Sequence, residues 1–289
     1  MRIKKLTVIL LTIVIMGIGA LVLGCTSPNP TTTPAAGSTT PVALSGSIDV
    51  IGSTSVGPYA EELAAAFDAK NNNRTSVGIS QVGSGPGIKA VSDGTTDVGM
   101  SSRDLTSDEK SNGLVTYKIC DDGIAVIVNK ANPINSLTVD QIRDIFARNV
   151  TGWKQFGGDD KDIIVVTREA GSGTRDGFET LVMQKKANIT SQAIQQGSTG
   201  GVSTYVAGNK YAIGYISYGS LDTSQVNAIA VNGVTPSVAT IKDKTYLIQR
   251  PFLFVTKGEA TELSKAFIDY VLSPEGQAKL ASHNLVTVS

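Results

Sequence analysis

Hydrogen-bond donors gather at one glycine-rich turn near the middle of the chain. Ile163–Thr167 is rich in β-branched residues and predicts a buried strand, and helical spacing begins at Asp176. Between them lies a Gly-Ser-Gly-Thr turn at 171–174, flanked by Arg168 and Arg175. The first backbone N–H groups of a helix have no partner inside the helix, and the positive end of its dipole lies there. With the hydroxyls and guanidiniums, they predict an oxyanion as the ligand.

Three further turns of the same kind follow predicted strands. They are Gly52-Ser-Thr-Ser-Val-Gly-Pro58, Gly83-Ser-Gly-Pro-Gly87 and Ser101-Ser-Arg-Asp104. Helix capping by Ser or Thr explains any one of them alone. Four such turns, two of them with arginine, favour a shared anion site. The GxGxxG and Gly-Lys-Ser/Thr phosphate signatures are absent, so the sequence does not predict nucleotide binding.

The charge balance argues against a large polyanionic partner. The chain holds 25 Lys and Arg residues and 25 Asp and Glu residues, and three of the basic ones lie in the first 24 positions. Without that leader, 22 basic residues face 25 acidic ones. No basic field for nucleic acid remains, so a local site must bind any anion.

Cysteine and histidine usage argues against an enzyme or a metal protein. Cys120 is the only cysteine after Cys25 and lies in an apolar run, which predicts an inert core residue. His283 is the only histidine, whereas Ser-His hydrolases and most zinc sites need histidines placed by partners. Asp121-Asp122 and Asp159-Asp160 adjoin glycines and are interpreted as turn residues. We therefore expect no catalytic residue, no metal and no cofactor.

The N-terminus has the form of an export signal. Residues 1–5 are basic, residues 6–23 are almost wholly apolar, and Leu21-Val-Leu-Gly-Cys25 resembles a lipobox. We expect a signal peptide at 1–24 and a lipid anchor on Cys25, with an uncleaved membrane helix as the alternative. The Thr-, Pro- and Ser-rich residues 25–45 predict a disordered tether. The folded part is then extracytoplasmic and held at the outer face of the cell membrane.

From residue 46 onward, short apolar runs alternate with helical patterns, which predicts an α/β fold with mostly parallel sheets. In such sheets ligands bind beyond the carboxyl ends of the strands, where the four turns lie. The predicted strands are 48–51, 77–82, 97–100, 124–128, 163–167, 213–216 and 252–256. Besides the helix after 176, the predicted helices are 59–70, 88–93, one that starts at a capping box on Thr106, 138–146, 261–272 and 274–281.

These motifs resemble those of the phosphate-binding proteins of phosphate ABC importers, which are type II periplasmic binding proteins. The resemblance covers nearly the whole chain after the leader. It implies two α/β lobes joined by a double crossover near 117–122 and 247–251, with lobe one at 46–118 plus 252–289 and lobe two at 119–251. The lobes would close on inorganic phosphate and pass it to a permease. The motifs are GSTSVGP (52–58), VGSGPGIK (82–89), DVGMSSR (97–103), TGW (151–153), TREAGSGTR (167–175), AIGY (212–215) and PFLF (251–254).

The resemblance also implies a set of phosphate-binding residues. Long bacterial members of the family carry an Asp where this chain has Ser102, and that Asp accepts the proton of hydrogen phosphate. The serine leaves sulfate, molybdate or tungstate as alternative ligands, and an enzyme acting on phosphoesters is the remaining alternative. Either arginine among the further candidates could instead bridge the lobes or pair with a carboxylate. The implied binding residues are Thr54, Ser55, Ser84, Ser102, Arg168, Ser172, Gly173 (through its backbone N–H) and Thr174, and the further candidates are Ser53, Arg103, Gly171 and Arg175.

Overall fold

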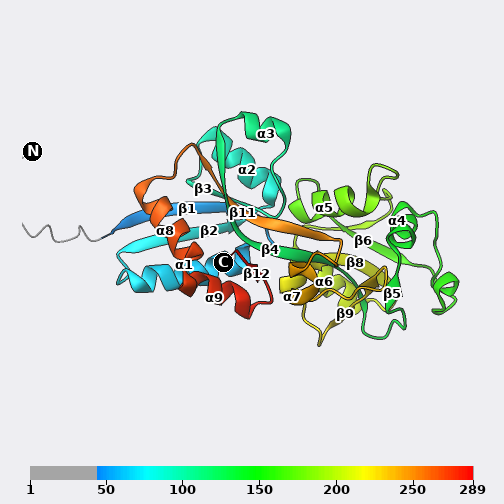
Figure 1. The fold of residues 1–289 in the computed structure, drawn as a ribbon. Helices are drawn as coiled ribbons and strands as arrows, with labels where there is room; N and C mark the ends of the chain where they lie inside the picture. Colours follow the sequence, from blue (N-terminus) through cyan, green and yellow to red (C-terminus); the bar gives the residue numbers. More distant parts are fainter. Residues whose placement is uncertain (1–43, 289) are drawn as a thin grey trace, which may run out of the picture. The chain divides into compact units, whose positions relative to one another are not determined.

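A mixed sheet of ten strands runs through residues 44–288, the part of the chain that the computed structural model describes (Figure 1). Its main order is β2-β1-β3-β11-β4-β8-β6-β7, and β9 and β12 pair with β4 off this path. Two short strands, β5 and β10, form a separate pair. The strands are β1 (Gly46–Gly52), β2 (Thr75–Gln81), β3 (Val98–Ser101), β4 (Leu114–Asn129), β5 (Ser136–Leu137), β6 (Ile164–Arg168), β7 (Ile194–Gln196), β8 (Ala212–Ser217), β9 (Val226–Ala228), β10 (Ala230–Val231), β11 (Gln249–Lys257) and β12 (Val286–Thr287).

Two long strands, β4 and β11, cross from one half of this sheet to the other. β4 pairs with β11 over residues 114–123 and with β8 over residues 124–128, antiparallel in both cases. The strands that precede helices pair in parallel, β1 with β2 and β3, and β6 with β7 and β8. The prediction of a mostly parallel sheet is therefore wrong for β4 and β11. One of them carries the chain across and the other brings it back, so they must run in opposite directions.

Capping signals in the sequence mark the starts of some helices. Thr106 and Thr138 each form a capping box, and Pro58 lies in the first turn of its helix. The helices are α1 (Gly57–Lys70), α2 (Ser84–Asp93), α3 (Ser107–Ser111), α4 (Val139–Ala147), α5 (Gly173–Phe178), α6 (Thr199–Gly208), α7 (Val238–Lys242), α8 (Glu262–Leu272) and α9 (Pro274–Ser282), with single turns η1 (Trp153–Phe156), η2 (Glu179–Met183) and η3 (Tyr218–Ser220).

Helix α2 begins at Ser84, four residues before the predicted start at Ile88. Glycine is a poor helix former, so the helix start at Ser84 is not evident from the sequence of this turn. Gly87 has a packing role instead, since a Cβ on it would lie 2.5 Å from Gly52 Cα. Its small size lets α2 approach β1 closely, and this approach brings Ser84 to the end of the strand.

The two largest hydrophobic clusters each include residues of the crossing strand β4. Core A takes its residues from 48–120 and 252–285 and includes the contact between Phe67 and Phe267. Core B takes its residues from 124–248, with Val286, and includes the stacked rings of Phe178 and Tyr215. Elements packed on core A are called side A below, and those packed on core B are called side B.

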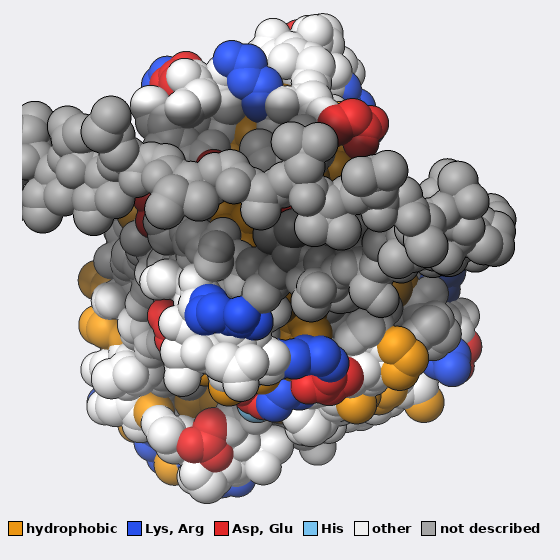
Figure 2. Space-filling view, turned by 90° about the vertical axis from the view of Figure 1, so that its left-hand side faces the viewer, with side chains coloured by type: hydrophobic (Ala, Val, Ile, Leu, Met, Phe, Trp, Pro, Cys, Tyr) orange, Lys and Arg blue, Asp and Glu red, His pale blue; other side chains and the backbone are white. Residues whose placement is uncertain are grey.

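The expected signal peptide, Cys25 and the spacer through residue 43 lie outside the described residues. Within residues 44–288, no helix is long and apolar enough to cross a membrane. On the face shown in Figure 2, basic and acidic side chains lie next to one another where described atoms are visible. Among the described residues, ion pairs such as Lys70–Glu275 and Lys279–Glu62 join α1 to α9.

Candidate functional site

Loops from both sides converge on a buried group of hydroxyls around one guanidinium, which we call the hydroxyl cluster. Side A contributes residues that follow β1 and β3 and the first residue of α2. Side B contributes the last residue of β6 and the residues at the starts of α5 and α6. No member is more than 7 % exposed. The members are Thr54, Ser55, Ser84, Ser102, Arg168, Ser172, Thr174 and Thr199.

Hydrogen bonds join the two sides of the cluster directly. Ser55 Oγ lies 2.8 Å from both Thr174 Oγ1 and Thr199 Oγ1. Arg168 Nη2 donates to Thr54 Oγ1 at 3.0 Å, and its Nη1 donates to Thr199 Oγ1 at 3.2 Å. Thr54 and Ser55 belong to side A and the other three residues to side B. The predicted binding residues therefore meet across the junction of the two sides.

The Arg168 guanidinium is oriented by an adjacent carboxylate. Its Nε and Nη2 donate to the two oxygens of Glu169 at 2.8 and 2.7 Å. With the bonds to two threonine hydroxyls, four of its five N–H groups are engaged within the described residues, and one N–H on Nη1 remains for a ligand. The backbone N–H of Arg168 donates to the Tyr215 hydroxyl, and burial raises the pKa of Tyr215 to about 12. Tyr215 is thus neutral and adds no negative charge to the site.

Ser84, Ser102 and Gly173 are packed against one another where α2 meets α5. Ser84 Oγ accepts a hydrogen bond from the Ser102 backbone N–H at 3.1 Å. A Cβ on Gly173 would lie 2.3 Å from Ser84 Oγ and 2.7 Å from Ser102 Oγ, so only glycine fits there without a shift. Beside them, the Gly85 N–H donates to the Gly171 carbonyl at 2.9 Å, and Gly171 has a φ of 85° that favours glycine.

Ser53 orders the start of α1, and within the described residues its side-chain hydrogen bonds stay inside its own loop. Its Oγ accepts hydrogen bonds from the backbone N–H groups of Ser55 at 3.1 Å and Val56 at 3.4 Å. The N-cap residue itself is Val56, which has no side-chain cap. Ser53 therefore holds the turn that presents the Ser55 hydroxyl.

The two further candidate arginines pair with carboxylates. Arg103 makes two hydrogen bonds to Glu109, at 2.7 and 2.8 Å, and its Nε donates to Asp176 Oδ2 at 2.7 Å. The guanidinium of Arg103 holds the pKa of the Glu109 carboxyl below its usual range. Arg175 donates to Glu179 at 2.9 Å. Because Asp176 lies on side B, Arg103 also bridges the two sides.

Thr199 joins the cluster although it was not predicted from the sequence. It opens α6 directly after β7, and Gly197-Ser-Thr-Gly-Gly201 repeats the order of strand, glycine-rich turn and helix seen in the four predicted turns. Strand β7 has only three residues, Ile194–Gln196, so its apolar pattern is too short to recognise. The glycine-rich turn itself was the available signal.

The prediction that Asp121-Asp122 is a turn is wrong, because both residues lie inside β4. Asp122 Oδ2 accepts hydrogen bonds from Arg250 Nε and Nη2 at 3.2 and 3.0 Å, and Arg250 Nη1 donates to the Ser102 carbonyl at 3.1 Å. Both charged groups are buried, and burial raises the pKa of Asp122 and lowers that of Arg250. The two residues meet because the register of β4 and β11 places Arg250 opposite Asp122, and this pairing cannot be predicted from the local sequence. Asp159-Asp160 lies in a loop, as predicted.

The cysteine and the histidine considered for catalysis lie in the core and in a surface pair with a carboxylate. Cys120 is fully buried, and burial raises the pKa of its thiol, which agrees with the prediction of an inert core residue. His283 Nε2 lies 2.6 Å from Glu62 Oε2 on the side A surface. Within residues 44–288, no group of three or more His, Cys, Asp or Glu side chains is placed to hold a metal ion.

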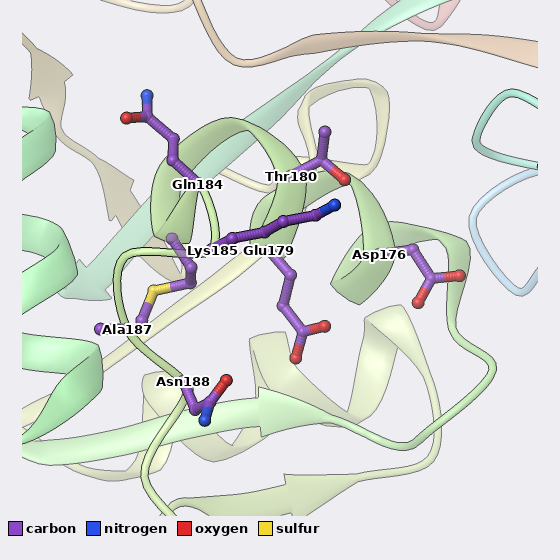
Figure 3. A pocket seen from close by; sticks show the side chains of 8 residues that line it. Asp176, Glu179, Thr180, Gln184, Lys185, Ala187 and Asn188 are labelled. Carbon is purple, nitrogen blue, oxygen red and sulfur yellow. The ribbon is translucent and has the colours of Figure 1, made fainter.

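A separate surface pocket beside α5 is lined by none of the cluster residues (Figure 3). It presents two carboxylates and one ammonium group with polar uncharged side chains. Carboxylates repel an oxyanion, so this pocket does not have the chemistry that the hydroxyl cluster offers. Its lining residues include Asp176, Glu179, Thr180, Gln184, Lys185 and Asn188.

The hydroxyl cluster has the chemistry to hold a small oxyanion. A guanidinium can only donate hydrogen bonds, and each hydroxyl can rotate to donate one. Hydrogen bonds to charged groups contribute about 1.5–3 kcal/mol each, and a micromolar site needs about 8 kcal/mol. The hydroxyls and free N–H groups gathered here are numerous enough for such a site after the anion is desolvated.

The chain is similar in sequence and fold to several known proteins. The model of the PBP superfamily domain matches residues 30–275. The phosphate-binding protein PstS of Bacillus subtilis is 30 % identical over 242 residues, which cover 82 % of this chain and 79 % of that protein. A putative phosphate ABC transporter substrate-binding protein with bound phosphate from Clostridium perfringens is 43 % identical with a TM-score of 0.81, over 84 % of this chain and 100 % of that one. An ABC-type phosphate transport receptor from Vibrio cholerae is 36 % identical with a TM-score of 0.71, over 83 % and 99 %.

Proposed function

The chain belongs to the PBP superfamily and, within it, to the PstS phosphate-binding proteins, and we propose that it captures inorganic phosphate for an ABC import permease. One observation carries the proposal: loops of both sides bring hydroxyls, one oriented guanidinium and a glycine backbone into a single buried cluster. The similar protein from Clostridium perfringens contains bound phosphate, which supports the same ligand here.

Each side contributes its own donors to the phosphate. Side A binds through the hydroxyls that follow β1 and β3 and through the start of α2. Side B binds through the free N–H of the guanidinium, the hydroxyls of α5 and the backbone N–H of one glycine. The proposed binding residues are Thr54, Ser55, Ser84, Ser102, Arg168, Ser172, Gly173 and Thr174, and the bridging and capping contacts described above give Ser53, Arg103, Gly171 and Arg175 supporting roles.

Sides A and B act as two lobes that close on the ligand. The proposed boundaries are 46–118 plus 252–289 for one lobe and 119–251 for the other. The separate cores and the two strands that connect them support this division. Because β4 and β11 are the main connection between the lobes, rotation about them would open the cleft and admit phosphate.

The receptor works outside the cell membrane. The leader at 1–24 directs export, a lipid on Cys25 anchors the chain, and residues 25–45 give the folded part reach to its permease. The protein is a binding protein and not an enzyme, since capture and release need no chemical step. Its partners are phosphate and the permease, and its net charge after the leader is removed is unfavourable for nucleic acid.

Phosphate titration of two single-residue variants tests the proposal. Arg168→Ala and Thr174→Val should weaken phosphate binding by at least about tenfold in calorimetry, because each loses a donor to a buried charge. Thr180→Val, an exposed change on the neighbouring turn η2, is the matched control and should bind like the wild type. A wild-type protein that does not bind phosphate, or two variants with unchanged affinity and intact folds, would refute the proposal.

Another tetrahedral oxyanion is the second candidate ligand, and Ser102 is the observation that favours it. This side chain can accept or donate a hydrogen bond, so it does not repel a fully deprotonated anion. Titrations with sulfate, molybdate and tungstate beside phosphate separate the two candidates. A sulfate affinity equal to or higher than the phosphate affinity would favour the second.

A further inference from the structure

Thr199 contacts three members of the proposed binding site at once, and we propose that it is a positioning residue for the anion site. Its Oγ1 lies 2.8 Å from Ser55 Oγ and accepts from Arg168 Nη1 at 3.2 Å, and its backbone N–H donates to Thr54 Oγ1 at 3.3 Å. Its side chain is buried, so these contacts form away from water. The inference rests on the proposed function and adds a fifth loop to it.

The hydrogen-bond inventory of Thr54 shows one effect of this contact. A hydroxyl has two lone pairs and one proton. Thr54 Oγ1 accepts one bond from Arg168 Nη2 and one from the Thr199 backbone N–H. Both lone pairs are then occupied, and only the O–H proton remains. Thr54 is thereby set as a donor, which is the state that an anion needs.

The Thr199 side chain also sets the direction of hydrogen-bond donation in the rest of the cluster. Arg168 can only donate, so Thr199 Oγ1 must be the acceptor in their bond. The Thr199 hydroxyl can then donate a hydrogen bond to Ser55 Oγ, and the Ser55 hydroxyl can donate one to Thr174 Oγ1. In this arrangement each hydroxyl donates once, and the Thr174 proton is left for an outside acceptor. A guanidinium on side B thus orients hydroxyls on both sides.

Helix capping does not account for the Thr199 hydroxyl. The N-cap of α6 is Ser198, whose Oγ accepts from the Gly201 backbone N–H at 3.0 Å. The same loop is joined to the Arg168 loop by a bond from the Glu169 N–H to the Gln196 carbonyl at 3.3 Å. This bond joins the Thr199 loop to the Arg168 loop, and the Thr199 hydroxyl, which does not cap α6, interacts with Arg168 and Ser55.

Three variants test the inference by phosphate calorimetry and by the rate of phosphate release. Thr199→Val keeps the shape but removes the hydroxyl, and it should weaken phosphate binding roughly tenfold or more, mainly through faster release. Thr199→Ser keeps the hydroxyl and should stay within about threefold of the wild type. Thr204→Val, an exposed change on the same helix, is the matched control and should be neutral. If the valine variant does not fold, Thr199→Ala replaces it, because alanine needs less room.

The outcomes separate this inference from the proposed function. Wild-type phosphate binding with an unchanged Thr199→Val affinity overturns the positioning role and leaves the receptor function standing. Absence of phosphate binding by the wild type overturns the function itself. A loss of affinity shared by Thr199→Val and Thr199→Ser would also overturn the inference, because the hydroxyl would then not be the group that matters. Weak binding by the valine variant with rescue by serine supports it.

Discussion

Replacing Gly173 by alanine should block closure of the two sides without damaging either of them. The added Cβ would lie 2.3 Å from Ser84 Oγ and 2.7 Å from Ser102 Oγ, and both of these atoms belong to side A. Gly173 itself lies in α5 on side B and does not have a positive φ, so alanine is conformationally acceptable there. The strain therefore falls on the junction of the two sides and not on the fold of side B.

The size of the effect follows from these distances. Ordinary contact begins at 3.4 Å, so the sides must separate by about 1.1 Å at this point. The 2.8 Å bonds from Ser55 to Thr174 and Thr199 would lengthen to about 3.9 Å, which is beyond hydrogen-bond range. A bound phosphate would likewise lose contact with one side. Two lost bonds to a charged ligand amount to about 3 kcal/mol, or roughly a hundredfold in affinity.

Calorimetry with phosphate and thermal unfolding without ligand test this prediction together. Gly173→Ala should lose at least about a hundredfold in affinity and keep its ligand-free melting temperature within a few degrees. Gly208→Ala is the matched control, because nothing lies within 4 Å of a Cβ at that helical position. A Gly173→Ala protein that binds phosphate within about threefold of the wild type would refute the reasoning, since the sides would then not need to meet here.

Three further outcomes depend on the ion pairs around the cluster. Asp122→Asn leaves the buried Arg250 guanidinium without its counter-ion, so the free energy of unfolding measured in urea should fall by about 3–5 kcal/mol. Replacing both Asp122 and Arg250 by leucine should recover part of that loss. Asp176→Asn removes a partly exposed contact with Arg103 and should change phosphate affinity by no more than about threefold, whereas a tenfold loss in calorimetry would contradict this. The pKa of Glu109 is held below its ordinary 4.5 by Arg103, so the ionised carboxylate stabilises the fold above pH 4.5 and ceases to do so as the pH falls through the lowered pKa. The difference in melting temperature between Glu109→Gln and the wild type should therefore shrink below pH 4.5, and a constant difference would count against the pair.

The sequence predicted the elements whose signals are local. Strand β6 has a run of β-branched residues, and α4 begins at a capping box on Thr138, so both were found within one residue of their bounds. The first half of β4 was missed because residues 114–123 mix charged and apolar side chains. Helix α6 was missed because its first turn is rich in glycine, which is a poor helix former.

The candidate site was predictable where its residues lie in turns with a recognisable form. The turns at 52–58 and 171–174 follow strong strands, and the structure brings both to the cluster. Thr199 follows a strand too short to recognise. Arg250 and Asp122 lie 128 positions apart and meet only because β4 and β11 are paired in one register. Long-range pairing of this kind depends on tertiary structure, which no local pattern encodes.

The hydroxyl cluster also has a property that a receptor needs for release. With the sides together, Ser55, Thr174 and Thr199 satisfy one another by hydrogen bonds at 2.8 Å, and Arg168 is held by Glu169. Phosphate therefore accepts from the protons that remain, such as those of Thr54 and Thr174, without breaking the bonds already made. Each such bond to the charged ligand contributes about 1.5–3 kcal/mol. Under the proposed function, a permease that pulls the two sides apart would break several such contacts at once, so one site would combine tight capture with complete delivery.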